Sequence, residues 1–195
     1  MPVLQTYIRG IVAHVPATHW TVIGALSLTL TVFLAGRKKC SVYGAIALGI
    51  SVFVGLVLLD TAVVIRYSGA LKHMSGYDLR FDFSRLFRKS GLGPAEMMSN
   101  IAAFIPFGLF FSEFLASAKR FSAGRRLGLA TLAGFGLSLC IETLQLLLRV
   151  GFFELTDLVM NTLGAFVGAG LAVLLRRFIC FARNDEEEPG IQIND

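Results

Sequence analysis

Charged residues are scarce in this chain, and their scarcity decides its class. Of the 195 residues, 16% are charged and 55% are hydrophobic, and the mean hydropathy is +0.69. A water-soluble domain of this length carries more charge, so the composition excludes the soluble globular class and predicts a multi-span membrane protein. The net charge is only +5. We interpret its placement as setting membrane topology and expect no nucleic-acid partner.

Cysteine and histidine are too few and too scattered to suggest a metal site or a disulfide framework. The three cysteines are Cys40, Cys140 and Cys180, and the three histidines share no ligand spacing. We therefore expect no metal and no cofactor. We also expect no cleavable signal peptide, because residues 1–19 contain no clean apolar core before a small-residue cut site.

Five apolar stretches are long enough to cross a bilayer, whose hydrocarbon core needs about 17–25 helical residues. They occupy residues 20–36, 41–65, 97–118, 127–148 and 157–175. An amphipathic segment over residues 1–19 is predicted to lie as a helix at the membrane interface. The predicted fold is an all-α polytopic membrane bundle. Its parts are an interfacial segment (1–19), two spans (20–66), an extracytoplasmic loop (67–96), a three-helix core (97–177) and a cytoplasmic tail (178–195).

Basic residues near the span ends favour one orientation. Three clusters fall on the same side of the five predicted spans: Arg37, Lys38 and Lys39; Lys119, Arg120, Arg125 and Arg126; Arg176, Arg177 and Arg183. Basic clusters close to span ends favour the cytoplasmic side. We therefore predict a multi-pass inner-membrane protein with its N-terminus outside and its C-terminus in the cytoplasm. Six further basic residues between positions 66 and 89 fall on the other side and weaken this bias.

Ionisable and amide side chains occur inside the last three spans, where a lipid-facing helix would have none. A charge at the bilayer centre costs about 2.5–3.5 kcal/mol on insertion scales, so such residues persist when they find partners or act in function. Spacings of four, three and four residues place one set on a single helical stripe: Ser138, Glu142, Gln145 and Arg149. By the predicted topology, this stripe meets the start of the last span near the outer surface. The predicted ligand-binding residues are Asn100, Glu142, Gln145, Arg149, Asp157 and Asn161.

The same side chains also have a structural interpretation. Ser99 with Asn100, and Thr156 with Asp157, are residue types that cap helix N-termini. Amides and carboxylates also join helices by hydrogen bonds, and the series Gly164, Gly168 and Ala172 is typical of closely packed helices. For Glu142 we favour function, because a buried carboxylate is costlier than an amide that would join helices equally well.

Three segments resemble the VanZ-like family. They are SNIAAFIPFG from Ser99, SLCIETLQ from Ser138 and ELTDLVMNTLGAFVG from Glu154, and the resemblance extends over roughly residues 97–170. The positions that match the family pattern are Asn100, Pro106, Gly108, Glu142, Gln145, Asp157, Asn161, Thr162 and Gly164. The resemblance implies a bacterial inner-membrane protein of the cell envelope. The family's namesake is associated with low-level resistance to the glycopeptide antibiotic teicoplanin.

Three classes of function fit these observations. The first is a protein that binds a membrane lipid headgroup or a lipid-linked envelope precursor in a polar pocket of the outer leaflet. The second is a membrane hydrolase or transferase with Glu142 or Asp157 as general base. We rank it lower, because the sequence offers no convincing nucleophile, and we assign no catalytic residue. The third is a small transporter or a structural membrane protein. The sequence leaves the oligomeric state open.

Overall fold

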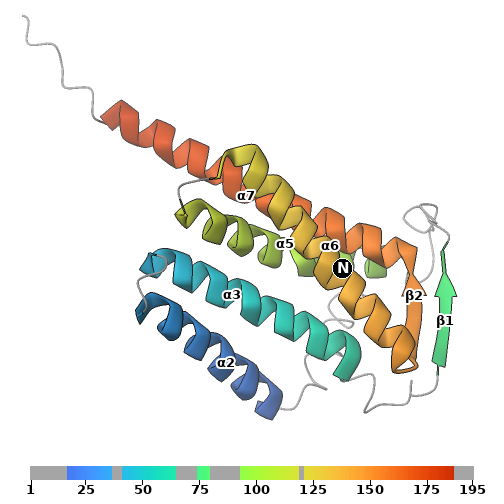
Figure 1. Ribbon diagram of the computed structural model, residues 1–195. Helices are drawn as coiled ribbons and strands as arrows, with labels where there is room; N and C mark the ends of the chain where they lie inside the picture. Colours follow the sequence, from blue (N-terminus) through green and yellow to red (C-terminus); the bar gives the residue numbers. More distant parts are fainter. Residues whose placement is uncertain (1–16, 37–40, 65–73, 80–92, 119–120, 187–195) are drawn as a thin grey trace, which may run out of the picture.

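Five long helices form a bundle in the computed structural model of the chain (Figure 1). The structure describes residues 17–36, 41–64, 74–79, 93–118 and 121–186. The helices are α2 (Ala17–Gly36), α3 (Val42–Leu59), α5 (Gly93–Ser117), α6 (Ala123–Leu147) and α7 (Leu155–Glu186). A π-helical turn, η1 (Asp60–Val64), continues α3. Each of the five helices contains a stretch long and apolar enough to cross a membrane. The predicted all-α membrane bundle is therefore confirmed.

Several helices extend beyond the apolar stretches that predicted them. α5 begins at Gly93 and not at residue 97, and α7 continues to Glu186, past the predicted end of its span. Hydropathy marks where a helix crosses hydrocarbon, whereas backbone hydrogen bonding continues into the polar residues outside. Of the predicted interfacial segment, only residues 17–19 are described, and they belong to α2.

Two short strands lie at one end of the bundle, and the sequence did not predict them. β1 (Met74–Asp78) pairs in parallel with β2 (Val150–Glu154), with Met74 opposite Val150 and Asp78 opposite Glu154. The residues between the last two predicted spans thus form a strand that pairs with the predicted extracytoplasmic loop. We call this end, with β1, β2, the end of α6 and the start of α7, the sheet end.

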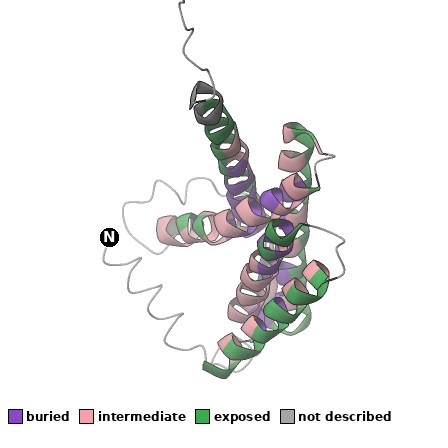
Figure 2. Cartoon of the chain, turned by 90° about the vertical axis from the view of Figure 1, so that its left-hand side faces the viewer, coloured by how far each residue is buried: buried purple, intermediate pink, exposed green. Residues whose placement is uncertain are grey.

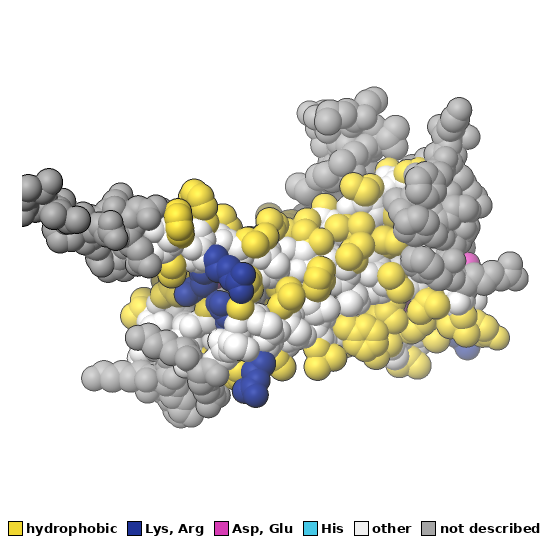
Figure 3. Space-filling view, turned by 90° about the horizontal axis from the view of Figure 1, so that it is seen from above, with side chains coloured by type: hydrophobic (Ala, Val, Ile, Leu, Met, Phe, Trp, Pro, Cys, Tyr) yellow, Lys and Arg dark blue, Asp and Glu magenta, His cyan; other side chains and the backbone are white. Residues whose placement is uncertain are grey.

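Basic side chains gather at the opposite end, which we call the basic end. It contains the start of α6 with Arg125 and Arg126, and the later part of α7 with Arg176 and Arg177. In Figure 3, dark blue atoms gather toward one end of the molecule, whereas hydrophobic side chains cover much of its length. The charge pattern that predicted topology is therefore also a feature of the folded bundle.

α5 and α7 pack against each other with almost no side chain between them. A methyl group built on Gly164 would overlap the carbonyl of Ile101, and one built on Gly168 would overlap the carbonyl of Ile105. Small residues at such positions let helix backbones approach closely in a membrane. The prediction of a small-residue packing face on the last span is confirmed, and it makes α5 and α7 the centre of the bundle.

The core lies in the half of the bundle near the sheet end. Its buried residues come from α3 with η1, α5, α6, β2 and α7: Val63, Phe104, Ile141, Val150 and Ala165. Figure 2 shows buried residues where the helices meet and exposed residues on their outer sides. The outer sides are apolar, as with Leu132 and Leu174, which suits contact with lipid. α2 packs mainly on α3 and has only Ile23 and Ser27 buried.

Candidate functional site

Glu142 joins α6 to strand β2. Its side chain is buried, with 3% of its surface exposed, and its Oε2 accepts a hydrogen bond of 2.9 Å from the backbone N–H of Glu154. A hydrogen bond within a folded protein contributes about 0.5–1.5 kcal/mol net, and a buried N–H left without a partner costs about 1–3 kcal/mol. Glu142 therefore fixes the last residue of β2 immediately before α7 begins.

Gln145 joins α6 to the π-helical turn at the end of α3. Its Nε2 donates to the backbone carbonyl of Ala62 at 3.0 Å, and the side chain is buried. A π-helical turn replaces the regular i→i+4 bonding of the preceding helix, and such turns are frequent at functional sites. Gln145 supplies a donor to a backbone acceptor in this irregular segment.

Asn161 joins α7 to α6. Its Nδ2 donates to Oγ of Ser138 at 2.9 Å, and both side chains are buried. Glu142, Gln145 and Ser138 thus lie on the stripe that the sequence predicted, and they hold β2, η1 and α7 around α6. These hydrogen bonds connect neighbouring elements of the bundle, as the structural interpretation of the sequence predicted. Whether this set also binds a ligand stays a prediction.

The other three predicted site residues lie around this network. Arg149 is not on the stripe, because α6 ends at Leu147 and Arg149 follows in the left-handed conformation (φ 55°) with an exposed side chain. Asp157, in the first turn of α7, is half-buried. Asn100 is half-buried on α5, one residue before the carbonyl of Ile101 that Gly164 approaches.

The proposed cap at Ser99 is wrong. Ser99 lies six positions inside α5, and its hydroxyl donates to the carbonyl of Glu96 at 2.7 Å. Thr156 is buried within the first turn of α7. The apolar run of this span begins at residue 97, whereas the helix itself already begins at Gly93. The edge of the apolar run therefore does not mark the helix N-terminus.

An open cleft of about 650 Å³ lies on the sheet. Of the residues that the structure describes, five from the two strands and their flanks line it: Tyr77, Asp78, Leu79, Phe152 and Glu154. We call it the sheet cleft. None of the six predicted site residues lines it, but Glu142 binds the backbone of one lining residue, Glu154. No sequence pattern predicted that residues 77–79 and 152–154 are neighbours, because the two segments are far apart in the chain and pair in parallel.

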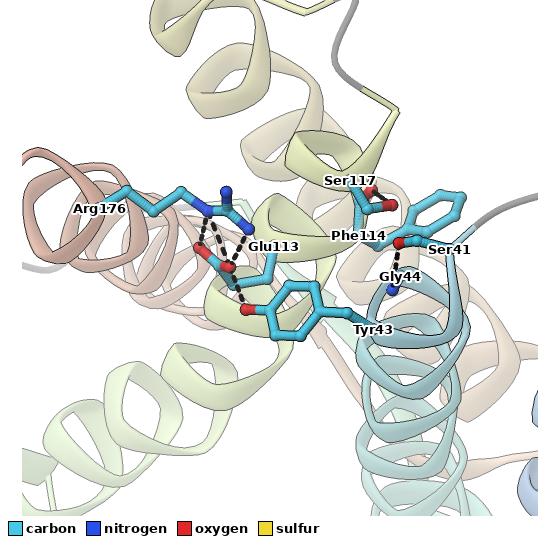
Figure 4. Close-up of polar contacts among 7 residues, drawn as sticks. All are labelled: Ser41, Tyr43, Gly44, Glu113, Phe114, Ser117 and Arg176. Atoms are coloured by element: carbon cyan, nitrogen blue, oxygen red, sulfur yellow. Dashed lines mark hydrogen bonds and ion pairs between the residues drawn. The ribbon is translucent and has the colours of Figure 1, made fainter. Parts of the chain in front are cut away.

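A charged cluster centred on Glu113 lies at the basic end (Figure 4). The Glu113 side chain is buried between three helices. Arg176 donates to it from Nε at 2.8 Å and from Nη2 at 2.6 Å, and the hydroxyl of Tyr43 donates to the same carboxylate. This cluster joins α3, α5 and α7, and its members are too far apart in the chain for their spacing to reveal it.

A polar side-chain contact joins α2 to η1. Nδ1 of His19 lies 3.0 Å from each carboxylate oxygen of Asp60. His19 comes from the start of α2 and Asp60 from the end of α3, so the pair also lies at the end of the bundle that holds the sheet.

Among the described residues, no group of three His, Cys, Asp or Glu side chains is arranged to hold a metal ion. No curated protein and no solved structure matches the chain. The VanZ/LLP1 family does match it, over residues 48–176. This range contains the buried network on α6 and α7, the described lining residues of the sheet cleft, and Glu113 with Arg176. The chain therefore belongs to the VanZ/LLP1 family.

Proposed function

We propose that the sheet cleft faces the outside of the inner membrane and binds the headgroup of a lipid or a lipid-linked envelope precursor. The observation that carries this proposal is the cleft itself, which combines two aromatic side chains with the carboxylates of Asp78 and Glu154. The cleft lies beside the ends of helices that are long and apolar enough to cross a membrane, so in the proposed orientation it is close to the outer lipid headgroups.

The orientation rests on basic residues. Four of the five arginines with described side chains lie at the basic end, and only Arg149 lies at the sheet end. In the sequence, the stretches between α2 and α3 and between α5 and α6 include further basic residues: Arg37, Lys38, Lys39, Lys119 and Arg120. Since basic residues next to spans favour the cytoplasm, the sheet end is outside. The C-terminus is then in the cytoplasm.

The lining of the cleft favours a headgroup rich in hydrogen-bond donors. Ionised carboxylates only accept hydrogen bonds, so Asp78 and Glu154 suit the amino or hydroxyl groups of a headgroup or a sugar. Tyr77 and Phe152 provide aromatic surface, which is enriched at the membrane interface and packs on apolar faces.

The buried network supports the cleft from below. The hydrogen bond from the Glu154 N–H to Glu142 fixes the strand that carries Phe152 and Glu154. Binding groups are effective when their supporting contacts hold them in place before the ligand arrives. In this account, Glu142 is a positioning residue.

Site-specific photocrosslinking tests the proposal. A photoreactive amino acid in place of Tyr77 is expected to capture one headgroup class in excess of its share in the membrane. The double substitution Asp78→Asn with Glu154→Gln should lower this capture by about tenfold, since a hydrogen bond to a charged group contributes about 1.5–3 kcal/mol.

The matched control is the same probe at Leu132, which is exposed on the lipid-facing side of α6. This position should capture bulk lipid in its membrane proportions, with or without the double substitution. Capture of the same lipid mixture from positions 77 and 132 would contradict a headgroup site.

A wall precursor as ligand would connect this chain to glycopeptide resistance, and we include that connection in the proposal. Cells that produce the protein should then tolerate more teicoplanin than cells that produce the variant with Asp78→Asn and Glu154→Gln. Equal tolerance in the two strains, with equal protein in the membrane, would remove resistance from the proposal.

A further inference from the structure

A second cleft, of about 370 Å³, lies at the basic end between α3, α5 and α7, and we call it the basic cleft. Its wall is apolar and includes Leu109 and Phe110 of α5 with Leu175 and Ile179 of α7. Leu175 and Ile179 are 54% and 62% exposed. The wall therefore continues into the lipid-facing surface of the bundle, and hydrocarbon can reach it from the side.

Arg176 lines the basic cleft in a fixed position. Nε and Nη2 of its guanidinium bind the carboxylate of Glu113, and its central carbon lies 5.6 Å from the centre of the Tyr43 ring. In Figure 4, the remaining nitrogen of Arg176 points away from Glu113. A guanidinium carries five N–H donors in a rigid fork, so one that is bound on one edge can still donate from another.

The charge around the basic cleft is positive. Arg125, Arg126, Arg176 and Arg177 lie at this end, and among side chains that the structure describes, Glu113 is the one carboxylate there. Glu113 offsets Arg176 by direct contact, which leaves the other three arginines as an excess. An occupant with one negative group and a long apolar part complements both the charge and the wall.

We propose that the basic cleft binds an anionic phospholipid. Its phosphate accepts hydrogen bonds from the outer edge of Arg176, and an acyl chain lies along the wall of α5 and α7. A soluble phosphate would satisfy Arg176 but leave this wall uncovered. Basic pockets between spanning helices on the cytoplasmic side are a recognised form of lipid-binding site.

The thiols of the chain provide a direct test. Cys180 lines the basic cleft, and Cys140 is exposed on α6, outside the lining. In detergent micelles that contain the Cys40→Ser protein, alkylation of Cys180 should be about fivefold slower with added phosphatidylglycerol than with added phosphatidylcholine. This factor is the preference for an anionic lipid expected from one well-placed arginine. The rate at Cys140 should be the same with either lipid. Equal rates at Cys180 with the two lipids would overturn the proposal.

Two variants separate binding from folding. Glu113→Gln with Arg176→Gln removes both charges and leaves no unpaired buried ion, so the protein should fold but lose the protection of Cys180. Arg177→Gln removes a neighbouring exposed charge and should retain most of it. Protection that persists in the double variant would overturn the proposal. Protection by soluble glycerol phosphate alone would overturn the assignment to a lipid.

Discussion

Replacing Gly168 by leucine is expected to destabilise the folded protein by roughly 3 kcal/mol or more, the upper part of the range for overpacking a core. The atoms that the new side chain would meet are the carbonyl of Ile105 and the amide nitrogen of Leu109, both in the backbone of α5. A backbone cannot turn aside as a flexible side chain can, so α5 and α7 would have to separate. Thermal unfolding in detergent, with the yield of monodisperse protein, measures this loss.

Gly170→Leu is the matched control. Gly170 lies on the same helix only two residues away, and a methyl group built there meets no atom within 4 Å. The substitution adds the same side chain to the same helix and should change the melting temperature little. Equal losses from the two substitutions would mean that leucine harms α7 generally, and that α5 and α7 do not pack as closely as described.

Replacing Arg176 by glutamine is expected to have the second largest effect. Removal of one member of a buried ion pair costs about 3–5 kcal/mol, because it leaves the other charge buried without compensation. The Arg176 side chain is 35% exposed and the Glu113 side chain 10% exposed, so we expect the lower end of that range. Unfolding of the purified protein at neutral pH gives the value.

Replacing the partner residue Glu113 by glutamine should destabilise the protein less than Arg176→Gln does. In Glu113→Gln, the amide oxygen can still accept hydrogen bonds from Arg176 and from the hydroxyl of Tyr43. The more exposed Arg176 can also move toward water. The double variant, with Glu113→Gln and Arg176→Gln, leaves no unpaired buried charge, so it should be more stable than Arg176→Gln alone. If the double variant is as unstable as the sum of its parts, the two residues do not act as a pair.

Sequence patterns predicted the spanning helices well because the bilayer imposes a simple rule on length and hydropathy. The small-residue face of α7 was predictable for a similar reason, since Gly164 and Gly168 recur at helical spacing. The two strands were not predictable. A strand of five residues, such as β2, is too short to show a clear alternation of polar and apolar side chains. Its parallel pairing with β1 joins segments that are more than seventy positions apart in the sequence.

The site was predictable in part. Glu142, Gln145 and Asn161 were identified because polar groups inside an apolar run need partners, and the structure supplies those partners as Glu154, Ala62 and Ser138. The prediction that Arg149 lies on the same stripe was wrong, because it assumed that the helix continues past Leu147. The Glu113–Arg176 pair depends on how α5 and α7 cross, which no local pattern encodes.

The central claim is that Glu142 acts by holding β2 and thereby shapes the sheet cleft. Photocrosslinking from position 77 in two variants tests it most directly. Glu142→Gln retains an oxygen that can accept from the N–H of Glu154, whereas Glu142→Ala does not. We predict that the glutamine variant keeps headgroup capture and the alanine variant loses it, with both proteins folded. Loss of capture in a folded Glu142→Gln protein would contradict the account, because the carboxylate charge itself would then be required.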